Sequence, residues 1–238
     1  WKVSREEQDQ LSFESHTKAA KAYQDGFYND LIVPYKGVAR DSIVRADTTM
    51  EKLGKLTPVF DKSGAGSMTA GNSTALTDGA GAVFLASEDF ARENNLTAQA
   101  YFSDAESAAV DHVHGAGLLM APTIAVATML KRNNLALQDF DFYEIHEAFA
   151  GQVLCTLKAW ESADYCKDVL GLPSALGSID RNRMNVKGGS VALGHPFGAT
   201  GARVVGTLAK LLNEKGKGRG LVSICTGGGM GVAAIIEK

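Results

Sequence analysis

From residue 98 to the end of the chain, segments with the composition of strands alternate with segments that have the periodicity of helices. Strands are expected at 98–113, 139–145, 221–225 and 232–236, and helices at 122–131, 148–159 and 198–212. Pro122 stands in the first turn of one of these helices, where a missing N–H costs nothing. Strands that alternate with helices predict an α/β fold built in layers.

The first 97 residues have a different character, with helical signals on either side of a long polar stretch. Helices are expected at 4–25 and 87–97, a buried strand at 79–86, and an exposed, loop-rich subdomain at 27–70; a polar connection is expected later, at 161–184. Ser4 and Glu7 have the spacing of a capping box, and Ser87 is a typical N-cap residue. Residues 79–86 are small and apolar, which is typical of a buried strand.

Charge and cysteine content argue against several classes of protein. The net charge is -3 and the basic residues are scattered, so the electrostatic footprint of a nucleic-acid-binding protein is missing. No apolar run reaches the roughly 18 residues that a membrane helix needs. Three cysteines without a CxxC spacing fit neither a disulfide framework nor a zinc site, and they favour a reducing compartment.

Two histidines stand in contexts that favour chemistry. His146 and Glu147 follow an expected strand and open an expected helix, where backbone N–H groups point outward. The plain alternative is a histidine N-cap and a glutamate that pairs with the helix dipole. His195 lies between Gly194 and Pro196, a rigid frame that suits a positioned imidazole, although a buried histidine in a tight turn would look the same.

Cys225 ends an apolar strand and is followed at once by a glycine-rich loop. Free N–H groups in such a loop can form an anion pocket, and a nearby imidazolium could activate the thiol. The alternative is a buried cysteine that acts as a small hydrophobic residue. His195 and Cys225 together suggest a Cys–His pair in which the thiol is either a nucleophile or a proton-transfer acid/base, and their spacing leaves both roles open.

These three motifs, in this order, resemble those of the thiolase family. Residues 146–149 are similar to its Asn/His-Glu-Ala-Phe motif, 194–196 to its Gly-His-Pro motif and 225–227 to its Cys-x-Gly motif; residues 69–74 and 77–80 resemble the end of its first core half, and 4–9 a helix of its CoA-binding loop domain. The resemblance implies the layered α-β-α-β-α thiolase fold, of which this chain holds the C-terminal half and part of the loop domain. It divides the chain into 1–70, part of the loop domain; 71–97, the end of the N-terminal core half; and 98–238, the C-terminal core half.

The resemblance also implies an activity, acyl-CoA C-acyl transfer, with a role for each motif. His195 would activate a nucleophilic cysteine, and Cys225 would move the proton at the α-carbon of the second acyl-CoA. His146 would hold a water that joins His195 in one oxyanion hole, and the N–H of Gly227 would help to form a second. Coenzyme A enters as substrate and product, and neither a metal nor another cofactor is implied.

Four residues resemble positions that bind the substrate or CoA. Arg45 and Phe60 match loop-domain positions that contact CoA, Thr74 matches a Ser/Thr beside the pantetheine, and Phe149 belongs to the first motif. His146 in place of Asn favours the subgroup that resembles trifunctional-complex β-subunits and their bacterial counterparts, which act in fatty-acid β-oxidation. This subgroup implies a homo-oligomer, a dimer or a tetramer, with a possible β-oxidation multienzyme partner. The expected location is cytoplasmic, or alternatively mitochondrial.

One element of the family pattern is missing. The family's nucleophile lies in a Cys-x-Ser-type segment, and neither Cys155 nor Cys166 has that context. Because the chain begins at Trp1 with a helix cap, we expect residues upstream that carry the nucleophile, and we expect the 238 residues to be inactive alone. Two alternatives stay open. One is a related ketoacyl synthase, which is disfavoured because Cys225 stands where that family has His or Asn, and the other is a non-catalytic acyl-CoA-binding or scaffold protein.

Overall fold

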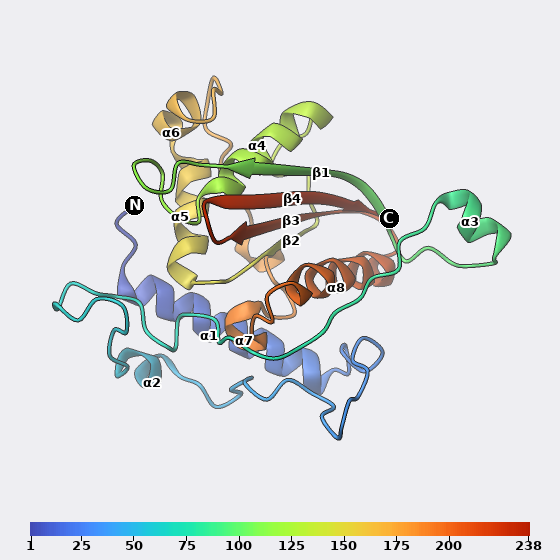
Figure 1. Ribbon diagram of the computed structural model, residues 1–238, viewed down its shortest axis with the longest axis horizontal. Coiled ribbons are helices and arrows are strands. Elements are labelled where there is room, and N and C mark those ends of the chain that lie inside the picture. Colours follow the sequence, from blue (N-terminus) through green and yellow to red (C-terminus); the bar gives the residue numbers. More distant parts are fainter.

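The computed structural model describes residues 1–238 and contains one four-stranded mixed sheet (Figure 1). The strands are β1 (Tyr101–Ala109), β2 (Phe142–Ile145), β3 (Arg219–Thr226) and β4 (Met230–Glu237), in the order β1-β4-β3-β2. β2 runs parallel to β3, and the other neighbours are antiparallel. All four predicted strands after residue 98 are present, and the α/β fold class is confirmed.

Helices cover both faces of the sheet (Figure 1). Leu221 and Ile235 pack toward α4 (Ala121–Asn133) and α5 (Ala150–Glu161), whereas Val222 and Ala234 pack toward α8 (Ala199–Lys215). Because successive side chains of a strand point to opposite faces, the central strands β3 and β4 contribute to both apolar layers. The resulting α-β-α arrangement buries the sheet on two sides, as continuous apolar strands require.

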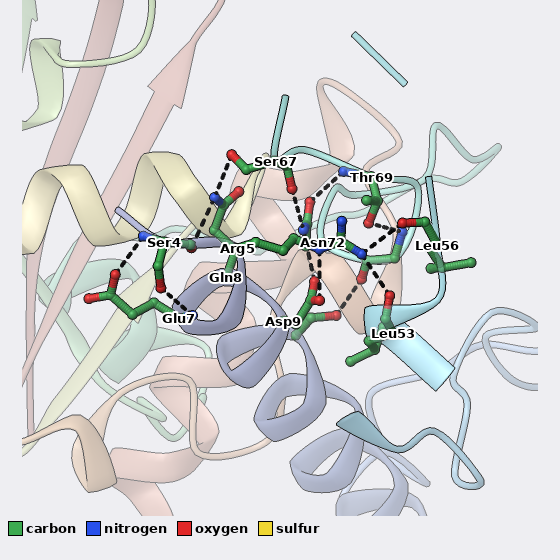
Figure 2. Close-up of polar contacts among 12 residues, drawn as sticks. Ser4, Arg5, Glu7, Gln8, Asp9, Leu53, Leu56, Ser67, Thr69 and Asn72 are labelled. Atoms are coloured by element: carbon green, nitrogen blue, oxygen red, sulfur yellow. Dashed lines mark hydrogen bonds and ion pairs between the residues drawn. The ribbon is translucent and has the colours of Figure 1, made fainter. Parts of the chain in front are cut away.

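Helix α1 (Arg5–Gln24) joins the core to the loop-rich segment that follows it. Arg5 Nε donates to Asp9 at 2.7 Å, and its Nη2 donates to the carbonyls of Leu53 and Leu56 at 2.7 and 2.9 Å. Asn72 Nδ2 donates to the other oxygen of Asp9 at 2.9 Å (Figure 2). Two side chains of α1 therefore hold the end of α2 (Met50–Gly54) and the segment around residue 72 in place.

Residues 79–86 do not form the predicted strand, and this prediction is wrong. The segment is extended but belongs to no sheet, and Phe84 is 73% exposed. An apolar sequence becomes a buried strand only where another strand offers hydrogen bonds and a face to pack against, and none lies beside this segment. The following helix, α3 (Glu88–Glu93), forms as predicted, with the Ser87 hydroxyl accepting from Phe90 N.

Two regions contain more helix than their sequences predict. The polar connection includes α6 (Ala163–Asp168) and a 3-10 turn (Arg181–Arg183), and α7 (Ser190–Leu193) lies in the glycine-rich turn before His195. Each has only six residues or fewer, too few to show a hydrophobic period. Residues 27–70 are mostly exposed loop around α2, as predicted, and none of the helices combines the length and apolar character required to cross a membrane.

Candidate active site

The first and third motifs meet at the carboxyl ends of two parallel strands. His146 follows the last residue of β2, and its N–H donates to the carbonyl of Ser223 on β3 at 2.9 Å. Cys225 lies two residues further along β3, next to its end. In an α/β sheet the carboxyl ends of neighbouring parallel strands form one edge, and this is where such folds place their ligands.

The second motif brings His195 to the same place. The rings of His146 and His195 are 4.3 Å apart between centroids, with their planes inclined by 47°. The backbone N–H of His195 donates to the carbonyl of Ala75 at 3.0 Å. Gly194 precedes it at φ 86°, and a Cβ on Gly194 would lie 2.7 Å from the side chain of Thr77, so only glycine permits this approach.

Both imidazoles are held neutral. Burial, together with the neighbouring His195 and Arg203, lowers the pKa of His146 to about 3. Burial and Arg203 also lower the pKa of His195. A neutral imidazole can donate one hydrogen bond and accept a proton, so the pair can serve as donor and base without prior deprotonation.

The buried state of His146 should make the stability of the protein depend on pH. Between its folded pKa of about 3 and the unfolded value of 6.5, the unfolded chain binds the extra proton, so stability is lost as the pH falls. We expect this histidine alone to contribute a loss of about 2 kcal/mol between pH 7 and pH 5. Urea unfolding of the natural protein and of His146→Asn at both pH values measures the effect; His16 titrates in both proteins and cancels. Equal pH dependence of the two proteins would contradict the prediction.

Cys225 is a protonated thiol at rest. Its side chain is 6% exposed, its Sγ donates to Gln152 Oε1 at 3.4 Å, and burial raises its pKa to about 12. The sequence left open that an imidazolium activates this thiol, but His146 and His195 are neutral, and neither forms a hydrogen bond with Cys225. The resting thiol is therefore suited to give a proton to a developing carbanion rather than to attack a carbonyl.

Gly227 begins the turn between β3 and β4, the two strands that were expected to be joined by this glycine run. Residues 227–229 form a three-residue hairpin connection, with Gly228 and Gly229 at φ 88° and 77°. The N–H of Gly227 is exposed and donates to no acceptor within the protein. It lies two residues after Cys225 and remains free to donate to an oxyanion.

Glu147 does not have the role of helix-dipole partner that the plain alternative gave it. Helix α5 begins at Ala150 with Phe149 as its N-cap, so neither His146 nor Glu147 caps it. Glu147 is instead 1% exposed and accepts three hydrogen bonds, from Ser15 Oγ (2.7 Å), Asn185 Nδ2 (2.6 Å) and Val191 N (3.2 Å). Burial raises its pKa, and these donors oppose the shift. The carboxylate thus ties α1, residue 185 and α7 to the loop that carries His146.

Close approach of Glu147 requires glycine at position 189. A Cβ on Gly189 would overlap the carboxyl group of Glu147, which would have to leave its three hydrogen bonds to make room. We expect Gly189→Ala to lower the free energy of unfolding of the natural protein by about 3 kcal/mol, the upper range for overpacking. Gly206→Ala in α8 is the matched control, because no atom lies within 4 Å of its Cβ position, and it should be neutral or slightly stabilising. Equal urea midpoints for both variants would contradict this account.

The four predicted substrate-binding residues lie in three places. Thr74 lies beside the site, since its N–H donates to Ala148 O at 3.0 Å and its hydroxyl to Ser190 O at 2.6 Å. Phe149 and Phe60 are in edge-to-face contact, with ring centroids 5.6 Å apart. Arg45 is exposed and lines a separate pocket of about 430 Å³, which also includes Ser73, Ala75 and Val191 and therefore reaches the segments around Thr74 and α7.

The other two cysteines lie elsewhere. Cys155 is half-buried in α5, where burial raises its pKa and the nearby Lys158 opposes the shift. Cys166 is buried in α6 and donates to the carbonyls of Ala159 and Trp160. Neither contacts the two imidazoles. No group of three or more His, Cys, Asp or Glu side chains is arranged to hold a metal ion.

Comparison with known proteins gives one consistent result. Residues 96–238 match the model of the thiolase C-terminal domain, and residues 1–89 match that of the thiolase N-terminal domain. A protein of Alteromonas mediterranea named 3-ketoacyl-CoA thiolase is 42% identical over 99% of the chain. The crystal structure of human mitochondrial 3-ketoacyl-CoA thiolase in complex with CoA is 35% identical over 100% of the chain, with a TM-score of 0.82. That of the Bacillus anthracis acetyl-CoA acetyltransferase is 36% identical over 99%, with a TM-score of 0.79. The chain spans about half of each: 55% of the first two and 56% of the third.

Proposed function

Because this chain belongs to the thiolase family, we propose that it supplies the acid/base half of an acyl-CoA C-acyltransferase active site. The reaction is thiolytic cleavage of a 3-ketoacyl-CoA, or the reverse Claisen condensation of an acyl-CoA with acetyl-CoA. The observation that carries this proposal is the contact of two neutral imidazoles beside a strand that ends in a protonated thiol. The names of the relatives, 3-ketoacyl-CoA thiolase and acetyl-CoA acetyltransferase, support the same reaction class.

In the cleavage direction, a cysteine thiolate from another part of the protein attacks the 3-keto carbon after His195 takes its proton. The C2–C3 bond then breaks, and its electron pair leaves on C2 as the enolate of acetyl-CoA. Cys225 gives its thiol proton to C2, which releases acetyl-CoA and leaves an acyl thioester on the nucleophile. Cys225, left as a thiolate, takes the thiol proton of CoA, and the resulting CoA thiolate attacks the thioester. The shortened acyl-CoA forms, and the nucleophile leaves as a thiolate that takes its proton back from His195. His146 and His195, and separately the N–H of Gly227, stabilise the oxyanions along this path.

The nucleophile is the component that this chain does not supply. Cys155 and Cys166 do not contact the imidazoles, and Cys225 is protonated and buried. We expect the natural protein, incubated with acetyl-CoA and digested, to carry the acetyl thioester on a cysteine other than these three. Peptide mass spectrometry locates the adduct. Acetyl on Cys225 would make that residue the nucleophile and overturn the assignment.

Arg45, Phe60, Thr74 and Phe149 are proposed to bind the CoA part of the substrate. The pocket that Arg45 lines also includes Ser73, which precedes Thr74, and Val191 in α7. A pantetheine arm that follows this pocket would run from Arg45 toward the two imidazoles. An exposed guanidinium at its mouth suits the phosphates of CoA. The human structure is a complex with CoA, which supports CoA as the ligand here.

Several finer features belong to the same proposal. We place the reaction in fatty-acid β-oxidation, in a homo-oligomer that can associate with a multienzyme partner, in the cytoplasm. Three free thiols favour a reducing compartment. The alternative is a non-catalytic acyl-CoA-binding protein, which the lack of a nucleophile among the three cysteines favours. Turnover of a 3-ketoacyl-CoA by the natural protein separates the two, because a scaffold would bind the substrate without consuming it.

A further inference from the structure

The imidazole of His146 forms one hydrogen bond within the protein, to a hydroxyl group that forms a second hydrogen bond with a guanidinium. His146 Nδ1 lies 2.7 Å from Ser190 Oγ, at the start of α7. Arg203 Nη2, from α8, lies 2.5 Å from the same hydroxyl oxygen. The other ring nitrogen of His146, Nε2, is buried and contacts no donor or acceptor in the protein.

The direction of these hydrogen bonds follows from the chemistry of the three groups. A guanidinium has only donors, so Arg203 must donate to Ser190 Oγ. The hydroxyl has one hydrogen, and His146 Nδ1 is the only other group within hydrogen-bonding distance of Oγ. A buried hydroxyl hydrogen without an acceptor is costly, so Ser190 donates to His146 Nδ1. In a neutral imidazole the proton must then lie on Nε2.

We infer that Arg203 and Ser190 act as positioning residues that hold His146 in the Nε2-protonated tautomer, so that Nε2–H is a fixed donor aimed at the substrate's oxyanion or its bridging water. This inference rests on the proposed function and adds to it two residues outside the three motifs' catalytic positions. The structure also excludes the doubly protonated ring, since burial and the neighbouring cation lower the pKa of His146 to about 3.

The two imidazoles of the site differ in whether the direction of the hydrogen bond at Nδ1 is fixed. His195 Nδ1 bonds to Thr200 Oγ1 at 2.7 Å, and no cation donates to that hydroxyl, so its hydrogen bond can run in either direction. His195 is thus free to gain and lose a proton, as a base must be, whereas His146 is fixed as a donor. Arg203 Nη1 also donates to Gly194 O at 2.8 Å, so one guanidinium positions the frames of both rings.

The tautomer can be observed directly. We would label the natural protein with ring-15N histidine and record long-range 1H–15N spectra, assigning His146 by its absence in His146→Asn. The expected result is an upfield, protonated Nε2 and a downfield, bare Nδ1. A wild-type spectrum with the proton on Nδ1 overturns the inference. In Ser190→Ala the two nitrogens should shift toward an averaged pair, and an unchanged spectrum would likewise overturn it.

Kinetics provide the second measurement. Ser190→Ala should lower kcat by about 10- to 100-fold and change KM by less than about twofold. This loss is at most comparable to the effect of removing an oxyanion donor outright, because His146 itself remains. Arg203→Lys keeps the charge but cannot donate to Ser190 Oγ and Gly194 O with the geometry of a guanidinium, so its kcat should also fall. Ser103→Ala, on exposed β1, is the matched control and should leave kcat unchanged. Equal kcat for wild type and Ser190→Ala overturns the relay. If the wild type shows the expected spectrum but no turnover, the proposed function fails and the relay stands.

Discussion

Replacing Cys225 with alanine should abolish thiolytic cleavage and condensation in the natural protein while leaving its acylation by acetyl-CoA detectable. The thiol is buried, holds its proton at neutral pH and lies near the end of β3, at the sheet edge where His146 follows β2, so its loss removes the acid proposed to protonate the α-carbon. A positioned general acid contributes about 10²- to 10⁴-fold, and we expect kcat to fall within that range. Spectrophotometric turnover and intact-protein mass spectrometry measure the two half-reactions separately.

Matched variants make this result specific. Cys155→Ala, in α5 and away from the imidazoles, should leave both half-reactions unchanged. Cys225→Ser keeps the shape of the side chain but supplies a much weaker acid, so its turnover should also be low. Loss of acylation in Cys225→Ala would show that Cys225 is the nucleophile, and the roles of the two cysteines would have to be exchanged.

Replacing Glu147 with alanine should have the largest effect on stability. It removes the acceptor for three buried donors on three separate segments: Ser15 in α1, Asn185, and Val191 N in α7. Each buried donor left unpaired costs about 1–3 kcal/mol, so we expect a total loss of about 4 kcal/mol. The loop that carries His146 loses its anchor at the same time, and kcat should therefore fall in the fraction that folds.

Glu147→Gln separates charge from hydrogen bonding. The amide oxygen can still accept hydrogen bonds, but the NH2 group faces at least one donor. The loss in free energy of unfolding should therefore be about half of that expected for Glu147→Ala. Glu161→Ala, exposed at the end of α5, is the control and should change the free energy of unfolding by less than about 0.5 kcal/mol. Urea unfolding of the four proteins gives the comparison; a Glu147→Ala variant as stable as Glu161→Ala would contradict the role assigned to the carboxylate.

The missing strand at 79–86 shows where local pattern stops being informative. Its composition is that of a buried strand, yet in this structure Phe84 is exposed and no ladder forms. Strand formation depends on a partner, whereas a helix satisfies its own backbone. This is why α1 and α8 lie close to their predicted bounds, and why the short α6 and α7, whose formation depends on packing, were missed.

The candidate site was predicted in part. His146, His195 and Cys225 stand out because a histidine between glycine and proline, or a cysteine before a glycine run, is a local signal. For Glu147 the sequence offered a role in the first motif or pairing with the helix dipole, and neither predicts the three hydrogen bonds that it accepts from distant segments. Ser190, Arg203 and Gln152 carry no such signal, since serine, arginine and glutamine occur at many helical positions.

By itself, the sequence determined the α/β class, the capping box of α1, the apolar faces of the strands and the three motifs, because each depends on residues within a few positions of one another. The tertiary structure alone decided that His146 and His195 touch, that Glu147 joins three segments, and that Arg203 reaches His146 through Ser190. These contacts join residues between 13 and 132 positions apart. They depend on strand order and on which helix covers which face, and such long-range choices leave no periodic trace in the chain.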